Sequence, residues 1–132
     1  MFEYHIEPRL SETDALGHIN NTVLPVWFEE ARKELFRIFN PSLSQKTWNL
    51  ILKKYEIEFM VQIEHSKIVN VITGIEHIGS RSFVVHQIAK QNGVDVAIGK
   101  TVMIYFDYQT SQTAEIPPEI QLQLEKHSLN SA

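Results

Sequence analysis

A helical repeat of hydrophobic residues spans residues 22–39. Its apolar positions, spaced three or four apart, are Val23, Leu24, Trp27, Phe28, Ala31, Leu35, Ile38 and Phe39. This spacing predicts one long amphipathic helix whose wide apolar face lies on a sheet. Asn20, Asn21 or Thr22 can cap its start. Pro25 is tolerated because it falls in the first turn, where amide protons lack intrahelical partners.

Hydrophobic and polar residues alternate with a period of two in the other long segments, which is typical of β-strands with one buried face. The predicted strands cover residues 2–6, 54–63, 69–75, 82–90 and 94–108. In the strand that follows the helix, the face expected to be buried consists of Tyr55, Ile57, Phe59, Val61 and Ile63. Asn92 and Gly93 accept positive φ, so they predict a tight hairpin before the last strand. Apolar residues at helical spacing after Pro117 predict a short terminal helix to about residue 129.

The order of these elements is strand, helix and four further strands, so the predicted fold class is α+β. We expect a curved antiparallel sheet of about five strands wrapped around one long helix. No repeat, linker or low-complexity tract divides the sequence, and residues 1–132 are interpreted as a single domain. Long strands leave an open sheet edge, a problem that small proteins often solve by pairing subunits.

Composition argues against several classes of protein. The sequence contains no cysteine, which excludes disulfides, thiolate metal sites and a cysteine nucleophile. The first residues do not have the pattern of a signal peptide, and no run of about 18 apolar residues is present to span a membrane. We therefore expect a cytoplasmic protein. The formal net charge of -4 is spread along the chain, which argues against nucleic acid as a partner.

The loop before the helix concentrates polar groups. Residues 11–21 contain an acid, Asp14, a histidine, His18, and two amides, Asn20 and Asn21. A helix N-terminus offers unpaired amide protons and the positive end of the helix dipole, so it can stabilise a developing oxyanion. Asp14 is close enough in sequence to act there as a general base or a nucleophile. The same residue types are also ordinary capping and turn residues, so composition alone favours a structural loop.

Two sequence motifs at a fixed spacing favour a catalytic loop over a purely structural one. Thr-Asp-Ala-Leu-Gly-His-Ile-Asn-Asn occupies residues 13–21, and Phe-Glu-Glu-Ala-Arg follows at residues 28–32. Together they resemble the 4-hydroxybenzoyl-CoA thioesterase-like family of hotdog-fold acyl-CoA thioesterases, whose pattern is approximately Thr-Asp-x-x-Gly-His-Val-Asn-Asn followed by Phe-Glu-x-Ala-Arg. The predicted strand order agrees with that family over nearly the whole chain. The resemblance implies a hotdog fold and hydrolysis of an acyl-CoA thioester.

The resemblance also implies roles for the loop residues. Asp14 either activates water or attacks the thioester carbonyl itself. His18 donates a hydrogen bond to the carbonyl or positions Asp14 and water, and a purely loop-stabilising role stays open. Gly17 permits a backbone turn that other residues would resist, while Asn20 and Asn21 shape the entry to the helix.

The match is looser around the substrate. Leu24 stands where similar sequences usually have tyrosine, and Pro25 where they have an aliphatic residue, so the acyl pocket beside the helix start is expected to differ. A later Gly-Ser-Arg-Ser-Phe sequence resembles the turn before the strand that faces the coenzyme. Ser80, Arg81 and Ser82 are therefore candidates for substrate binding, with the guanidinium contacting the coenzyme's phosphates. An exposed arginine without a partner is the alternative.

Other assignments stay open. In a second branch of hotdog thioesterases the acid lies on the helix, which makes Glu30 a reserve candidate. Glu29 and Lys33 have the spacing of a surface ion pair. The histidines show no spacing that suggests a metal site, and we expect neither metal nor cofactor.

Two other functions can use the same fold. One is a hydratase or dehydratase acting on acyl thioesters, and the other is a non-catalytic acyl-CoA or acyl-carrier binding module. Hotdog subunits characteristically pair so that their sheets continue and the active sites fall at the shared boundary. The resemblance therefore implies an acyl-CoA substrate and a homodimer or homotetramer.

Overall fold

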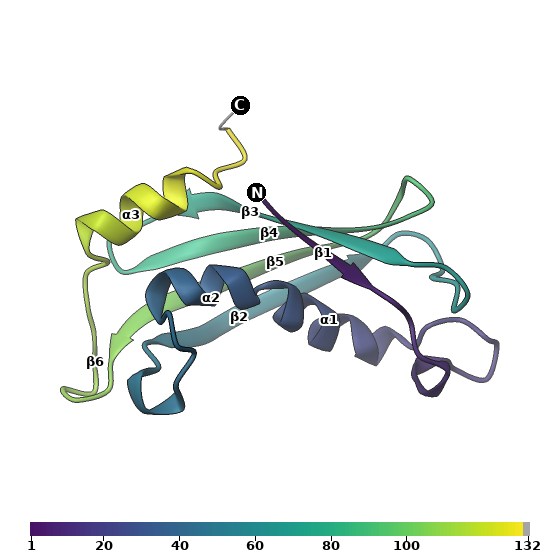
Figure 1. Ribbon diagram of the computed structural model, residues 1–132, viewed down its shortest axis with the longest axis horizontal. Helices are drawn as coiled ribbons and strands as arrows, with labels where there is room; N and C mark the ends of the chain where they lie inside the picture. The colour runs from purple at the N-terminus through teal and green to yellow at the C-terminus, as the bar shows by residue number, and fades with distance from the viewer. Residues whose placement is uncertain (131–132) are drawn as a thin grey trace.

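The computed structural model describes residues 1–130, and its main element is an antiparallel sheet with the strand order β1-β3-β4-β5-β2. The strands are β1 (Phe2–Ile6), β2 (Leu50–Phe59), β3 (Val69–Ile78), β4 (Ser82–Gln91), β5 (Val94–Asp107) and the short β6 (Gln112–Thr113), which pairs with β5. The helices are α1 (Leu24–Ala31), α2 (Lys33–Phe39) and α3 (Pro118–Glu125). The curved sheet lies against α1 and α2, and α3 lies at one end of it (Figure 1). The predicted α+β class is confirmed.

Most predicted elements agree with the structure because their signals are local. Strands β1, β4 and β5 begin and end within one residue of the predicted bounds, and β3 is somewhat longer. The hairpin between β4 and β5 is also confirmed, since Asn92 has a φ of 55° and Gly93 a φ of 75°. The terminal helix is α3, which ends earlier than predicted.

The prediction for β2 is wrong in its bounds and in part of its burial, since Ile63 is buried and Ile57 half-buried as expected but the other three residues are not. The strand covers Leu50–Phe59, and the side chains of Tyr55, Phe59 and Val61 are each 51% exposed. Within residues 1–130, β2 is the last strand of the sheet and pairs with β5 alone. Helix α1 packs against β1, β3 and the middle of β5, and it covers β2 only in part, because Ile57 packs against the core around α1 while a cavity lies between α1 and Tyr55. A period of two correctly indicates a strand, but it does not say whether anything covers it.

The predicted single helix is two helices, α1 and α2, interrupted at Arg32. In a continuous helix, the amide of Arg32 would donate to the carbonyl of Phe28. Here the Nε2 of Gln87 donates to that carbonyl at 2.9 Å, and the Arg32 amide donates instead to the carbonyls of Glu29 and Glu30. A buried side chain of β4 therefore accompanies the break in the helix.

The core has two apolar parts separated by a polar layer. One part surrounds α1 and includes Trp27 and Phe28, and the other lies between α2, α3 and the sheet. Buried polar side chains lie between them; they are Arg32, Thr73, Gln87 and Thr101. Hydrogen bonds within this layer connect α1 to β3, β4 and β5.

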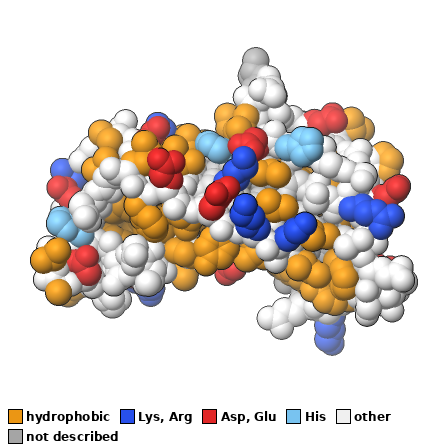
Figure 2. Space-filling view, turned by 180° about the vertical axis from the view of Figure 1, so that it is seen from behind, with side chains coloured by type: hydrophobic (Ala, Val, Ile, Leu, Met, Phe, Trp, Pro, Cys, Tyr) orange, Lys and Arg blue, Asp and Glu red, His pale blue; other side chains and the backbone are white. Residues whose placement is uncertain are grey.

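Ion pairs lie on the opposite face of the sheet. Lys100 contacts Glu76 at 2.8 Å and Lys90 contacts Asp95 at 2.5 Å. Figure 2 shows basic and acidic side chains side by side among hydrophobic ones on the back of the molecule. Among residues 1–130, no helix combines the length and apolar character needed to cross a membrane.

Candidate active site

The loop that carries Asp14 closes on itself through the carboxylate of that residue. Oδ1 of Asp14 accepts hydrogen bonds from the amide of Leu16 at 2.8 Å and from the amide of His18 at 3.1 Å. The amide of Asp14 donates to the carbonyl of His18 at 2.7 Å. Gly17, at the tip, has a φ of 82°, and a Cβ added there would meet no atom within 4 Å. Glycine is needed at this position for its backbone conformation and not for space.

The second carboxylate oxygen of Asp14, Oδ2, accepts no hydrogen bond from the loop amides. Within residues 1–130, no hydrogen bond or ion pair reaches Oδ2. The side chain is only half-buried, and it lines a cavity. Oδ1 therefore holds the loop, while Oδ2 can accept a proton or attack an electrophile.

Two further contacts fix the loop against the helix. Asn20 caps the turn that leads into α1, because its Oδ1 accepts from the amide of Thr22 at 3.0 Å and from its hydroxyl at 2.9 Å. Glu12, which is buried, accepts from the indole Nε1 of Trp27 at 2.9 Å and from the amide of Arg9 at 2.7 Å. The carbonyl of Glu12 also accepts from the amide of Asn20 at 2.9 Å.

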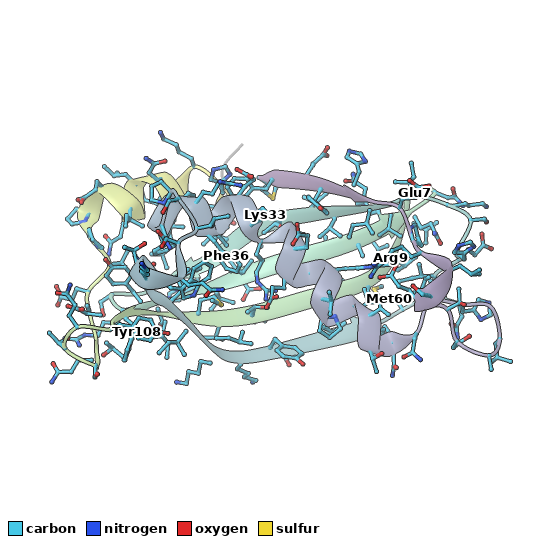
Figure 3. The ribbon with its side chains drawn as sticks, turned by 60° about the horizontal axis from the view of Figure 1, so that its bottom comes forward. Glu7, Arg9, Lys33, Phe36, Met60 and Tyr108 are labelled. Atoms are coloured by element: carbon cyan, nitrogen blue, oxygen red, sulfur yellow. The ribbon has the colours of Figure 1, made fainter. Side chains whose placement is uncertain are left out.

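The cavity beside Asp14 has a volume of about 570 Å³ and lies between the loop and the end of β2. One wall consists of Asp14, Ile19, Asn20, Asn21 and Leu24, and the other of Phe59, Met60, Val61, Gln62 and Ile63. The second wall is held in place because the amides of Met60 and Val61 both donate to the carbonyl of Val96, at 2.9 and 3.2 Å. The Met60 side chain lies at the α1 end of the sheet (Figure 3). The cavity offers polar groups on one side and apolar side chains on the other.

Of the predicted site residues, the structure brings Asp14, Asn20, Asn21 and Leu24 to this one cavity. His18 is adjacent in the loop but is not among the lining residues, and its Nδ1 is buried without a hydrogen-bond partner in the described residues. The helix amides that were predicted as an oxyanion site begin in the short turn Asn21–Val23, which precedes α1.

Ser80, Arg81 and Ser82 lie at the opposite end of the sheet. Ser80 and Arg81 lie in the turn between β3 and β4, and Ser82 begins β4, while the Asp14 loop is joined through Glu64 to Gln91 at the far end of β4. The ten residues of β4 separate the two ends by about 30 Å. Figure 3 shows the same separation, with Met60 at one end of the sheet and Tyr108 at the other. Within one chain, Arg81 therefore does not reach Asp14.

Arg81, the predicted phosphate contact, and Glu30, the reserve acid, both have partners within the described chain. Nη1 of Arg81 donates to the carbonyl of Thr113 at 3.1 Å and to its hydroxyl at 3.2 Å. Glu30 pairs with Lys33 at 2.5 Å and does not line the Asp14 cavity, and the predicted pairing of Lys33 with Glu29 is wrong. The break at Arg32 lies between Glu29 and Lys33 and removes the regular helical spacing. Residues 1–130 contain no group of three or more side chains placed to hold a metal ion.

Sequence reasoning missed two contributors to this region, Glu12 and the wall formed by residues 59–63. The contact of Glu12 with Trp27 joins residues 15 apart, and the wall depends on pairing with Val96. Neither contact has a local sequence signal. Glu12 accepts from the amide of Arg9, but arginine cannot supply the acceptor of a capping box, so the sequence has no capping signature that could have indicated a fixed acid here.

Comparison with known proteins identifies the family. A family model described as Thioesterase-like superfamily matches residues 8–124. The chain belongs to the thioesterase-like superfamily. Uncharacterized protein YsmA from Bacillus subtilis (strain 168) is 25% identical to this member over 100 residues, which cover 75% of this chain and 68% of that protein.

Solved structures of similar proteins agree with this membership. A predicted thioesterase from Bacillus stearothermophilus is 40% identical, with a TM-score of 0.95 over 99% of this chain and 98% of the other. A thioesterase from Thermus thermophilus, complexed with coenzyme A and Zn, is 22% identical, with a TM-score of 0.84 over 93% of this chain and 96% of the other, and shows the fold alone. The predicted hotdog fold and the predicted enzyme class, a thioester hydrolase, are confirmed.

Proposed function

We propose that this superfamily member hydrolyses acyl-CoA thioesters to a free acid and coenzyme A, with Asp14 as general base or nucleophile. One observation carries the proposal. The Asp14 carboxylate is held by two backbone amides through Oδ1, while Oδ2 is unpaired among the described residues and Asp14 lines a 570 Å³ cavity at the entry to α1. The similar thioesterase from Thermus thermophilus that binds coenzyme A supports the choice of coenzyme.

As a general base, Oδ2 of Asp14 takes a proton from water while the water oxygen adds to the thioester carbonyl carbon. The negative charge that develops on the carbonyl oxygen is stabilised by amides at the helix entry, near Asn20 and Asn21. The tetrahedral intermediate then collapses, the C–S bond breaks, and the leaving thiolate takes the proton back from Asp14.

As a nucleophile, Oδ2 attacks the carbonyl carbon directly and expels the thiolate, which takes a proton from solvent. The resulting mixed anhydride is hydrolysed by water, which regenerates the Asp14 carboxylate and releases the acid. Hydrolysis in water enriched in ¹⁸O under single-turnover conditions tests for direct attack, because label in Asp14 arises only by that route. Direct attack places the label in Asp14 if water adds to the aspartyl carbonyl, whereas general-base catalysis places it only in the product acid.

We further propose that two copies pair through β2. This edge strand is ten residues long and exposes the apolar side chains of Leu52, Tyr55 and Phe59. An unpaired strand edge of this length is a template for another strand. A two-fold pairing of β2 with β2 is antiparallel, so the Leu50 end of one copy lies beside the Phe59 end of the other.

That arrangement gives Arg81 a place in the proposed reaction. The carbonyl of Arg81 accepts from the amide of Tyr105, which is opposite Leu50 in the sheet, so Arg81 lies at the Leu50 end of β2. Antiparallel pairing brings this end toward the Asp14 cavity of the second copy, where the guanidinium can contact coenzyme phosphates. We therefore assign Arg81 to the site of the neighbouring subunit.

The test is release of free thiol from a panel of acyl-CoAs by the purified protein, with Asp14→Asn as the inactive reference. We expect turnover by the parent protein that depends on Asp14. Hydration of an enoyl-CoA without thiol release would replace the proposal with a hydratase. Saturable acyl-CoA binding without either reaction would replace it with a binding module.

A further inference from the structure

Arg32 carries a buried guanidinium that no carboxylate of residues 1–130 neutralises by direct contact. Its side chain is 5% exposed. Nη1 donates to Oε1 of Gln87 at 3.1 Å and more weakly to the hydroxyl of Thr101 at 3.4 Å, and Nε is buried without a partner in the described chain. Burial lowers the pKa of Arg32 to about 10, and the charge of Glu29 opposes this effect only in part.

The surrounding polar layer positions the guanidinium but supplies no negative charge. Gln87 is fixed by donating from Nε2 to the carbonyl of Phe28 at 2.9 Å and to the hydroxyl of Thr73 at 3.0 Å. Amide and hydroxyl oxygens satisfy single N–H groups of Arg32 and leave its charge desolvated. A buried charge without a counterion is costly, and the Phe36 ring, 5.9 Å from Cζ, offsets that cost only in part, so an anion at this site would stabilise the guanidinium.

A cavity of about 190 Å³ lies beside Arg32, between α1 and β2. Its other lining residues include Phe28, Tyr55, Ile57 and Thr101, so it is mostly apolar with one polar end. An apolar cavity of about 150 Å³ holds benzene, so this volume fits a short acyl chain. Glu29 also lines the cavity, but it is exposed, and water screens its repulsion of an anion.

The Arg32 cavity follows the Asp14 cavity along α1 and β2, although the two share no lining residue. On the helix side, Leu24 lines the Asp14 cavity and Pro25 lines the Arg32 cavity. On one face of β2, Phe59 lines the Asp14 cavity and Ile57 lines the Arg32 cavity. Arg32 is eight residues beyond Leu24, or about 12 Å along the helix axis. Nη1 of Arg32 contacts Thr101, which is opposite Tyr55 in the sheet, so the guanidinium lies four β2 residues, or about 13 Å, from Phe59 at the Asp14 cavity.

We infer that the Arg32 cavity is the distal acyl pocket and that Arg32 selects acyl groups ending in a carboxylate. This inference rests on the proposed thioesterase activity. Nε is closed off by the surrounding protein, whereas Nη2 has no partner in the described chain and is not fully buried, so Nη2 is the nitrogen that can donate to a carboxylate in the cavity. A substrate of this class is the CoA thioester of a short dicarboxylic acid, held by Arg32 at one end and presented to Asp14 at the other.

The experiment compares adipoyl-CoA with hexanoyl-CoA, which have acyl chains of six carbons and differ in the terminal carboxylate. We expect the parent protein to favour adipoyl-CoA in kcat/KM. Arg32→Met should lose roughly 10- to 100-fold on adipoyl-CoA, the effect of one charged hydrogen-bonded contact, and little on hexanoyl-CoA. Lys33→Gln is the matched control, because it removes the same charge from the adjacent, more exposed residue and should leave the preference unchanged.

A binding measurement separates this inference from the proposed activity. Adipate should bind the parent protein and Arg32→Lys in calorimetry, and it should not bind Arg32→Met, whose folding is checked by thermal unfolding. If no acyl-CoA is hydrolysed but adipate binds through Arg32, the activity is wrong and the anion pocket stands. The inference is overturned if hexanoyl-CoA is the better substrate of both proteins. It is also overturned if adipate does not bind the parent protein. A third contradicting result is that Arg32→Met dissociates a dimer or tetramer of the parent protein, which would mean that a second copy supplies the anion.

Discussion

The two carboxylate oxygens of Asp14 have different roles. Its Oδ1 closes the loop by accepting from the amides of Leu16 and His18, which is the structural role that composition alone favours. Oδ2 has no protein partner among residues 1–130, and the residue lines the cavity. The structural and catalytic interpretations of this residue are therefore compatible, because they concern different atoms.

Replacing Asp14 by asparagine separates its structural role in the loop from its proposed catalytic role. The amide oxygen of asparagine can still accept both loop hydrogen bonds, so Asp14→Asn should fold, but an amide cannot take a proton from water. We expect kcat for acyl-CoA hydrolysis to fall by roughly 10²- to 10⁴-fold with a small change in melting temperature. Asp107→Asn is a matched control, because Asp107 also accepts a backbone amide, that of Gln109 at 2.9 Å, in a turn at the other end of the sheet. Parental turnover in Asp14→Asn would remove the catalytic assignment and make Glu30 the next residue to test.

Arg81 is expected to act on binding and not on chemistry. A phosphate contact stabilises the ground state and the transition state equally, so Arg81→Ala should raise KM for acyl-CoA while kcat changes little. Arg37→Ala is the control, since Arg37 is another exposed arginine, paired with Glu34 at 3.1 Å. The competing view is that Arg81 only anchors Thr113, and it predicts an unchanged KM at low salt with a lower melting temperature.

At the scale of elements, the sequence predicts what is local and fails where distant residues decide. Strand periodicity, the Asn92-Gly93 hairpin and the Asn20 cap all depend on neighbours in sequence, and the structure has each of them. The break between α1 and α2 accompanies a hydrogen bond from Gln87, which is 59 residues from Phe28. No periodicity over residues 22–39 contains that information.

In the candidate site too, local features could be predicted from the sequence and contacts between distant residues could not. The loop side is a continuous motif, and of its predicted residues Asp14, Asn20 and Asn21 meet at the cavity, whereas His18 does not line it. The opposite wall could not be predicted, because residues 59–63 leave the strand and are placed by the carbonyl of Val96. Arg81 illustrates a third case, in which a motif is present but the single chain places it at the far end of the sheet.

The end of α3 should respond to acid. The ring of His127 stacks on Phe2 with centroids 3.9 Å apart, and the pKa of His127 lies below its ordinary value of 6.5 because of burial, then the N-terminal ammonium, then Lys126. The native state therefore binds this proton less readily than the unfolded chain does. Its contribution to stability is present above the unfolded pKa of about 6.5 and is lost as pH falls through the depressed value.

This predicts that the melting temperature of the parent protein falls more than that of His127→Phe between about pH 7 and about pH 5. Phenylalanine keeps the stacking on Phe2 and removes the titrating group. His77→Phe, at an exposed position of β3, should keep the parental pH dependence. Identical pH dependence in the parent and His127→Phe would show that His127 makes no such contribution.

In the molecule as a whole, the edge of the sheet formed by β2 is open. β2 has no partner strand on its outer side within the described chain, and its exposed apolar residues lie next to both proposed pockets. We expect a dimer or tetramer in a solution mass measurement. Charges on a strand edge oppose pairing, so Leu52→Lys combined with Tyr55→Lys should give a monomer with little activity. The same two charges at Val94 and Leu122, which are also exposed, should leave the assembly intact, and a fully active parental monomer would contradict the pairing.

If β2 pairs with β2 in antiparallel fashion, each site combines Asp14 of one copy with Arg81 of the other. Neither Asp14→Asn nor Arg81→Ala alone can then form a normal site. A mixed dimer of the two variants contains one site in which both residues are native, because each chain supplies the residue that the other lacks.

We therefore expect a mixed dimer, isolated with a different tag on each chain, to hydrolyse acyl-CoA with the parental KM at about half of the parental rate per dimer, by the count of restored sites. If Arg81 instead served the Asp14 of its own chain, the mixed dimer would contain one site without Asp14 and one without Arg81. Its activity would then keep the raised KM of Arg81→Ala. The value of KM in the mixed dimer thus decides whether the site is shared between subunits.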